Sequence, residues 1–365
     1  MALTVKPVAS EEELQVFLEL PYRIYSTNPC WVPPCPGTER WRLNTRKNPF
    51  FAHAEGCSFL AWRGKEAVGR ITAIVDTRNS DREAGSFGFF EVEEDREGAA
   101  ALLGAAADWL RSRGRRRMLG PFTLSSNEES GLLVEGFSVI PPVGLGYNLP
   151  YYPRLLEECH FSKIKDYLAY SWDCRQPLPD RLVKVARYAH KKNRLQITHF
   201  SLSGSSSETG VFQFLYNSSM AGLWGFAPLS RREARDTLRG LAQYADPELL
   251  LVGESMGEPV ALCLSLPDIN PVRQKNRGIL PPGRAWHRDV GRFRLAVLGV
   301  IPPARRRGLE SPLLLTTLEL AAAKGYQEAS FSLILEDNMM MNRVIAKLVP
   351  DARITSRYRV YGREL

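Results

Sequence analysis

The sequence predicts an α/β protein, because strand-like and helix-like segments alternate along most of its 365 residues. Two observations carry this prediction. Residues 293–300 form a β-rich apolar run, a basic turn follows, and residues 313–323 then carry apolar side chains at helical spacing. The first half of the chain repeats the order of elements in the second half. We therefore expect two domains, residues 1–176 and 177–365, each with a mixed central sheet flanked by helices.

Periodicity and turn residues place the elements of the first half. We expect strands at residues 3–5, 57–63, 67–76, 86–92, 118–125 and 163–173, and helices at residues 11–26, 98–113 and 151–159. Gly64-Lys65 joins the second and third strands as a hairpin. The Pro-containing segment 176–180 then separates the halves.

The second half begins with a basic helical pattern at residues 180–195 and a Ser/Gly-rich stretch, 201–208, that predicts a loop. Strands are expected at 260–266, 293–300, 328–335 and 353–361, and further helices at 313–323 and 339–348. Pro350 ends the last helix.

The turn after residue 300 is the first candidate site. A strand that runs through a Gly-containing basic turn into a helix directs unpaired backbone N–H groups at one point, and the helix dipole adds positive charge there. Such a turn can hold a phosphate or pyrophosphate, although a plain turn with solvated arginines remains the competing interpretation. The residues predicted to hold the anion are Arg305, Arg306, Arg307, Gly308, Leu309 and Ser311, and Leu298 and Val300 on the preceding strand are predicted to bind the rest of the same ligand.

The corresponding turn of the first half, residues 91–97, carries four glutamates and one aspartate. Its negative charge would repel a pyrophosphate. We therefore expect a phosphate-binding turn in the second half and none in the first.

The order of elements and the Arg305-x-x-Gly308 spacing resemble the acyl-CoA loop of the GNAT (GCN5-related) N-acyltransferase superfamily. The resemblance implies that this turn holds the pyrophosphate of CoA and that Asn338 contacts the cofactor arm. The chain departs from the family pattern at three positions. Glu310 replaces a small residue, Pro312 removes an amide donor, and Ile345 stands where the family often has a tyrosine general acid.

The whole chain also resembles a bacterial group of tandem GNAT proteins that includes bacterial ceramide synthases. The segments that carry this resemblance include 20–25, 28–34, 47–55, 120–122, 127–133, 151–153, 224–229 and 266–270. The resemblance implies an N-acyltransferase that moves an acyl group, expected to be long, from acyl-CoA or the phosphopantetheine of an acyl carrier protein to a lipophilic primary amine, preferably a sphingoid base. Two alternatives stay open: another amine acceptor, such as an amino acid or polyamine, and a non-catalytic ligand-binding module.

Aminolysis of a thioester requires a base for the amine proton and donors for the developing oxyanion. Four side chains of the appropriate type follow predicted strands or lie in predicted loops, and a fifth, a tyrosine, lies on the last predicted strand. They are Glu128, Glu129, Asp268, Tyr358 and His53. For the acidic pair a capped turn is the competing interpretation, and for His53 a satisfied core histidine.

The net charge of +8 fits an anionic donor, an acidic carrier protein or an anionic membrane surface. No nucleic-acid-binding motif accompanies the basic run 111–117, so we expect no nucleic acid partner. The six cysteines and five histidines show no metal-ligand spacing, which predicts no metal. The first residues lack a signal sequence, which predicts a cytoplasmic protein.

One loop predicts peripheral contact with the inner membrane. Residues 271–292 mix cations, Arg284 among them, with Ile279, Leu280 and Trp286. Basic, apolar and Trp side chains together are typical of a bilayer interface, and a plain surface loop is the equal alternative.

Overall fold

The structure is a computed structural model that describes residues 2–283 and 285–365. Arg284 lies outside the described residues. The elements of the first half are β1 (Leu3–Pro7), α1 (Glu11–Ile24), α2 (Thr38–Arg42), the 3-10 helix η1 (Pro49–Ala52), β2 (Ala54–Arg63), β3 (Glu66–Asp76), β4 (Ala84–Val92), α3 (Arg96–Ser112), β5 (Arg117–Gly120), β6 (Leu132–Glu135), α4 (Tyr152–Glu158) and β7 (Ser162–Asp173).

The second half adds α5 (Asp180–Asn193), β8 (Leu195–His199), α6 (Ser206–Met220), α7 (Arg231–Ala242), η2 (Pro247–Leu249), β9 (Leu250–Ser255), β10 (Glu258–Pro267), α8 (Asn270–Lys275), η3 (Ala285–Asp289), β11 (Arg292–Val300), η4 (Pro302–Ala304), α9 (Glu310–Ala323), β12 (Glu328–Leu335), α10 (Met339–Leu348) and β13 (Arg353–Glu364). The α/β class is therefore confirmed.

Local sequence explains most element boundaries. Ser10, Ser205 and Ser230 each begin a helix with a capping box, in which the serine accepts from an N–H and a glutamate three residues later bonds back. The expected loop 201–208 is partly wrong, because α6 begins at Ser206. The predicted strand 118–125 is too long, since β5 ends at Gly120 before Pro121.

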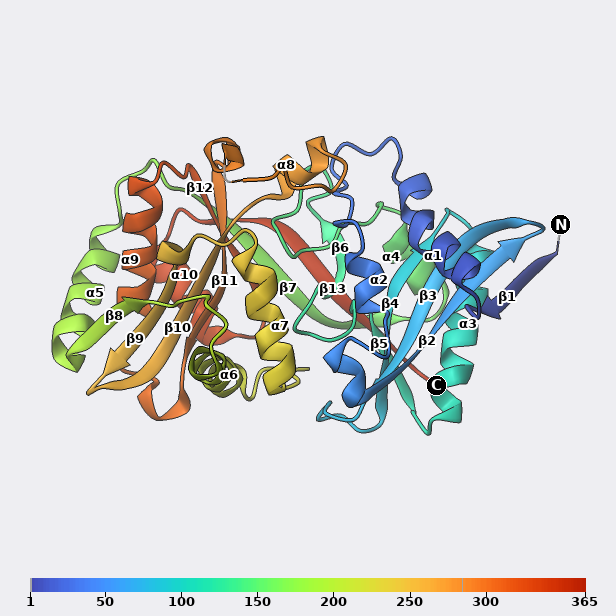
Figure 1. Ribbon diagram of the computed structural model, residues 1–365, viewed down its shortest axis with the longest axis horizontal. Coiled ribbons are helices and arrows are strands. Elements are labelled where there is room, and N and C mark those ends of the chain that lie inside the picture. The colour runs from blue at the N-terminus through green and yellow to red at the C-terminus, as the bar shows by residue number, and fades with distance from the viewer. Residues whose placement is uncertain (1, 284) are drawn as a thin grey trace.

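The described strands form one continuous mixed sheet in the order β1-β2-β3-β4-β5-β13-β7-β12-β11-β10-β9-β8, with β6 paired to β13. Helices α1 and α3 lie beside the first-half strands, and α5 and α9 lie at the opposite end of the molecule (Figure 1). The sheet passes without a break from one half to the other.

The last strand enters the first half of the sheet. β13 pairs with β5 on one side and with β7 on the other, and β7 in turn pairs with β12 of the second half. Figure 1 shows β13 crossing toward the first-half strands, so that the C-terminus lies near α3. We therefore propose residues 1–176 and 177–365 as two sequence halves that exchange strands at the centre.

A small hydrophobic cluster fills this centre. It contains Phe122 and Leu133 from the first half, Tyr167 from β7, Leu335 from β12 and Tyr358 from β13, all of them buried. Larger cores lie on either side of it, one in each half. Packing at the centre fixes how the two halves are placed around the cavity described below.

Candidate active site

β11 and β12 run parallel but separate along their length. They pair only from Arg292↔Glu328 to Leu295↔Phe331, at their first residues. β12 keeps its pairing with β7 as far as Leu335, and beyond the residues paired with β11, Ala296 and Val297 of β11 and Leu333 and Leu335 of β12 line one cavity. β11 and β12 thus diverge and leave a wedge-shaped opening in the sheet, which we call the wedge.

The cavity has a volume of about 1200 Å³ and is lined by side chains of both halves. Its apolar wall includes Trp31 from the first half and Phe212, Trp224 and Leu264 from the second. Ligand pockets for small molecules usually span about 300–1,000 Å³, so this cavity can hold a large, mostly apolar molecule.

Two of the predicted catalytic residues, Glu128 and Glu129, line this cavity. Arg42 of α2 joins them: its Nε lies 2.7 Å from Glu128 Oε2 and its Nη1 lies 3.5 Å from Glu129 Oε1. Burial raises the pKa of Glu128, although Arg42 opposes the shift. The shared guanidinium leaves Glu129 the less tightly paired of the two carboxylates.

The loop that carries the two glutamates is fixed against the second half. Asn127 Nδ2 donates to the carbonyl of Ala227 at 2.8 Å, and the Tyr216 hydroxyl donates to Asn127 Oδ1 at 2.9 Å. Ser126 Oγ donates to the carbonyl of Gly225 at 2.8 Å. These bonds position the acidic pair from both sides of the cavity.

Sequence reasoning missed Arg294, which lines the cavity at the root of the β11–β12 wedge. Its Nη1 donates to the Val143 carbonyl at 2.7 Å and its Nε to the Ser332 carbonyl at 3.1 Å. Within the described residues no carboxylate pairs with it, and burial lowers its pKa. An arginine inside an apolar strand pattern was the available signal.

The β11–α9 turn, residues 305–311, has the conformation of an anion-binding site. Arg306 and Gly308 adopt left-handed φ angles of 62° and 75°. For residues 306–309, no described protein group accepts from the backbone N–H. Alternating left-handed residues before a helix N-terminus concentrate such N–H groups in one concavity.

Two arginine side chains of this turn serve as scaffold. Arg305 turns inward, where Nη2 donates to the Ser219 carbonyl at 3.0 Å and Nε to the Val300 carbonyl at 3.2 Å. Arg307 Nε donates to Asn193 Oδ1 at 2.9 Å. Arg306 is exposed. The anion site is therefore made of backbone N–H groups, with Arg306 as its available cation.

The other predicted anion-binding residues surround this turn. Leu298 and Val300 lie on β11 beyond the end of its pairing with β12. Leu309 and Ser311 are buried beneath the turn, and Ser311 N–H donates to the Gly308 carbonyl. Asn338 lines the cavity and caps α10 through a bond from the Met341 N–H.

Asp268 is placed differently from the acidic pair. Its carboxylate accepts from Arg292 Nε at 2.6 Å and from the Val143 N–H at 2.8 Å, and it does not line the cavity as described. Asn270 Nδ2 donates to the Pro141 carbonyl at 2.8 Å. These strand-end groups pin a first-half loop to the second half, and burial raises the pKa of Asp268.

Tyr358 and His53 also lie behind the cavity wall. Tyr358 is 1% exposed, its hydroxyl has no hydrogen-bond partner among the described residues, and burial raises its pKa. His53 Nδ1 lies 2.8 Å from Asp76 Oδ1, and its Nε2 lies 3.2 Å from Glu233 Oε1. His53 therefore links β3 to α7 across the two halves.

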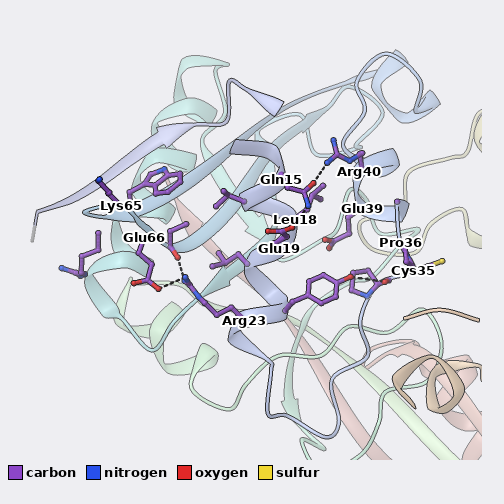
Figure 2. A pocket seen from close by; sticks show the side chains of 18 of the residues that line it. Gln15, Leu18, Glu19, Arg23, Cys35, Pro36, Glu39, Arg40, Lys65 and Glu66 are labelled. Carbon is purple, nitrogen blue, oxygen red and sulfur yellow. Dashed lines mark hydrogen bonds and ion pairs between the residues drawn. The ribbon is translucent and has the colours of Figure 1, made fainter. Parts of the chain in front are cut away.

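A second hollow of about 1360 Å³ opens on the first half between α1, residues 34–40 and the β2–β3 hairpin. Figure 2 shows two arginines of this groove with polar partners: Arg23 forms an ion pair with Glu66 at 2.7 Å, and Arg40 donates a hydrogen bond to Gln15 Oε1 at 2.6 Å. Residues 34–37 and Glu39 line both this groove and the central cavity. The groove and the cavity therefore adjoin at these residues.

The wedge between β4 and β5 in the first half is filled. A Cβ at Gly88 would lie 1.6 Å from the Phe122 carbonyl oxygen, so the backbone after β5 fits directly against β4. Tyr152 OH accepts from the Val92 N–H at 3.0 Å, and Tyr151 OH donates to the Val92 carbonyl at 2.7 Å. No equivalent opening for a donor remains at this point.

Glu91, expected near the end of a strand and at the start of the acidic turn 91–97, belongs to β4 and lines the central cavity. Tyr152 OH donates to its Oε2 at 2.7 Å, and Tyr25 OH donates to the same atom. Burial raises the pKa of Glu91 to about 7, against the opposing charge of Arg70.

This raised pKa predicts a pH-dependent stability. The folded state binds more protons than the unfolded chain between about pH 4.5 and about pH 7, so the free energy of unfolding falls as pH rises through this window. Glu91→Gln mimics the protonated acid, and we expect it to gain up to about 3 kcal/mol over the wild type at pH 8. Urea unfolding at pH 5 and pH 8 measures the effect. Glu319→Gln, an exposed control on α9, should leave the pH dependence of stability unchanged. If Glu91→Gln also left it unchanged, the burial argument would be wrong.

Part of the loop 271–292 packs against the protein. Trp286 is only 4% exposed, and its Nε1 donates to the Gly283 carbonyl at 2.7 Å. Arg273 Nη2 donates to the Pro33 carbonyl at 2.9 Å, which ties the loop to the first half. The Trp286 ring is therefore used in packing, whereas Ile279 is 54% exposed, and contact of this loop with a membrane stays a prediction.

Two further findings concern membrane-spanning helices and metal sites. None of the helices within residues 2–283 and 285–365 has the length and apolar character that a membrane span requires. The same residues contain no group of three or more His, Cys, Asp or Glu side chains that could hold a metal ion.

Two relatives match nearly the full chain. It is 32% identical over 381 residues to the bacterial ceramide synthase of Caulobacter vibrioides (strain NA1000 / CB15N), which covers 100% of this chain and 98% of that protein. It is 29% identical over 377 residues to Protein YghO of Escherichia coli (strain K12), and the match covers 99% of this chain and 95% of that protein. No protein-family model matches the chain.

Solved structures share the fold at low sequence identity. A tandem GNAT protein from the clavulanic acid biosynthesis pathway superposes with a TM-score of 0.58 and 12% identity, over 100% of this chain and 98% of that chain. A probable N-acyltransferase from Enterococcus faecalis V583 gives a TM-score of 0.55 and 11% identity, over 100% and 73%. The two tandem GNAT-like domains expected from the sequence are thereby confirmed.

An N-acyltransferase uses an acyl donor and an amine acceptor. The chain belongs to the tandem GNAT family of N-acyltransferases that includes the bacterial ceramide synthase of Caulobacter vibrioides.

Proposed function

We propose that this N-acyltransferase moves a long acyl chain from acyl-CoA or an acyl carrier protein to the primary amine of a sphingoid base, which is ceramide synthesis. The cavity of about 1200 Å³ carries the proposal. Its volume exceeds what an acetyl group and a small amine require, and its wall is largely apolar. The Caulobacter vibrioides relative, named as a ceramide synthase, supports the same acceptor.

The donor enters from the second half. The N–H groups of residues 306–309 bind the phosphates of its pantetheine arm, and Arg306 adds a cation. The arm then follows the open edge of β11 past Leu298, with Asn338 on the opposite side. This path brings the thioester to the root of the wedge, where Arg294 faces the cavity.

The acceptor enters from the opposite side. Its path runs along the first-half groove, which adjoins the cavity at residues 34–37, away from the β11–α9 turn. Opposite entries allow two lipophilic chains to lie in the cavity together, which apolar burial favours by roughly 0.8 kcal/mol per CH₂.

Glu129 serves as the general base. It removes a proton from the attacking amine, whose nitrogen forms a bond to the thioester carbon. Arg294 stabilises the oxyanion on that carbon, and the C–S bond then breaks as the thiolate leaves with a proton. Glu128 holds Arg42 and thereby positions Glu129, and the proton that Glu129 has taken from the amine passes to the thiolate.

A donor and acceptor panel tests this assignment. We expect amide product with long-chain acyl-CoA and sphinganine, detected by free thiol and by product mass, and much slower turnover with acetyl-CoA or with short soluble amines. Equal or faster turnover of a short amine would assign the chain to small-amine acylation instead.

A further inference from the structure

The exposed side of α5 is strongly basic. Six cations lie on it, all exposed: Arg181, Lys184, Arg187, Lys191, Lys192 and Arg194. We call them the α5 basic face. Within residues 2–283 and 285–365, no Asp or Glu lies within ion-pair distance of any of them. Many exposed arginines of the first half differ in this respect, as Arg23, Arg63 and Arg154 each pair with glutamate or aspartate. The net positive charge of the chain is thus concentrated at one end.

The α5 basic face adjoins the β11–α9 turn. Asn193 at the end of α5 donates from Nδ2 to the Arg307 carbonyl at 3.2 Å and accepts from Arg307 Nε at 2.9 Å. A Cβ at Gly308 would lie 3.6 Å from the Ala189 Cβ. Figure 1 shows α5 beside α9 at the end of the molecule. Arg306 and Arg307 therefore extend the positive surface to the donor phosphates.

The α5 basic face is larger than a nucleotide needs. α5 has 14 residues, which at 1.5 Å per residue give a length of about 21 Å. Tyr188, 67% exposed, and Val185, 37% exposed, lie among the cations. A cationic surface of this length with exposed aromatic and aliphatic side chains fits an acidic protein.

A bilayer is the weaker occupant. An interfacial helix must insert its apolar side among the lipids. The apolar side of α5, formed by Leu182, Ala186 and Ala189, is already buried, and α5 packs against α9. Only the polar side remains available.

We propose that the α5 basic face docks an acidic acyl carrier protein, whose phosphopantetheine then reaches the β11–α9 turn with its acyl chain. The inference rests on the donor site of the proposed function and adds the carrier as its physiological donor. The carrier body stays outside on α5 while its arm enters the wedge, since the turn and the helix are in contact. Charge complementarity would speed the encounter and make it sensitive to salt.

Charge reversal on α5 tests the docking surface. We compare palmitoyl carrier protein with palmitoyl-CoA as donors for the wild type and for Lys184→Glu/Arg187→Glu/Lys191→Glu. We expect KM for palmitoyl carrier protein to rise about tenfold or more in the triple variant, while turnover of palmitoyl-CoA stays within about twofold of the wild type. The control Lys6→Glu/Arg46→Glu/Lys47→Glu makes the same charge change at exposed first-half positions and should leave both donors unaffected.

Direct binding separates this inference from the acceptor assignment. Biolayer interferometry with palmitoyl carrier protein should show binding that weakens with added salt and is lost in the α5 variant, whichever amine is acylated. Equal losses with both donors would overturn the inference, as would a wild type that binds no carrier protein. The inference would also be overturned if the α5 variant lost binding to phosphatidylglycerol vesicles but kept binding to the carrier protein. That result would assign the α5 basic face to the membrane.

Discussion

Replacing Glu129 by glutamine is expected to lower kcat by about 10²–10⁴-fold while KM for the amine changes little, because a positioned general base contributes that much to proton transfer. Glutamine keeps the size of the side chain and can still accept a hydrogen bond from Arg42. The variant therefore removes the proton acceptor without opening the cavity. Steady-state kinetics with saturating acyl donor measure the effect.

Glu128→Gln is the matched control. Glu128 precedes Glu129 in the same loop, lines the same cavity and pairs with the same arginine. We expect a smaller loss of kcat, because Glu128 acts through Arg42. A larger loss for Glu128→Gln would exchange the two roles, and full activity in both variants would place the base elsewhere.

The order of elements was predictable because it depends on local patterns. Apolar periodicity located α9 and β11, and the Gly-containing basic turn between them marked the anion site. The position of β13 was not predictable in this way. Its pairing with β5 joins residues more than 200 positions apart, and strand order beyond neighbouring elements leaves no local trace.

The candidate site was predictable in part, for the same reason. Glu128 and Glu129 follow a strand and do line the cavity, whereas Asp268 follows a strand and pins a loop. The acidic pair and Asp268 look alike in the sequence. Whether a carboxylate at a strand end lines a cavity or holds a loop depends on its tertiary partners, which local sequence does not show. Trp286 shows the converse, since a Trp-bearing basic loop resembled a membrane anchor and its ring is buried.

Gly308→Val is expected to weaken donor binding by about 10²-fold, as several charge-assisted hydrogen bonds are each worth about 1.5–3 kcal/mol. Gly308 has φ 75°, which a β-branched residue strongly disfavours. The turn must then rearrange, and the N–H groups of residues 306–309 no longer converge. Calorimetric titration with CoA measures the loss. Charge reversal at Arg305 or Arg307 is less informative, because both side chains hold the turn together.

Gly257→Val controls for backbone strain. Gly257 lies in the β9–β10 hairpin with φ 83°, and a Cβ there would meet no atom within 4 Å. The substitution imposes a comparable strain of about 1–2 kcal/mol at a distance from the β11–α9 turn. We expect similar thermal stability for the two variants and wild-type CoA affinity in Gly257→Val. Wild-type affinity in Gly308→Val would show that the phosphates bind elsewhere. In both the wild type and Gly257→Val we expect one CoA per chain, because the first-half wedge is filled by the backbone at Phe122.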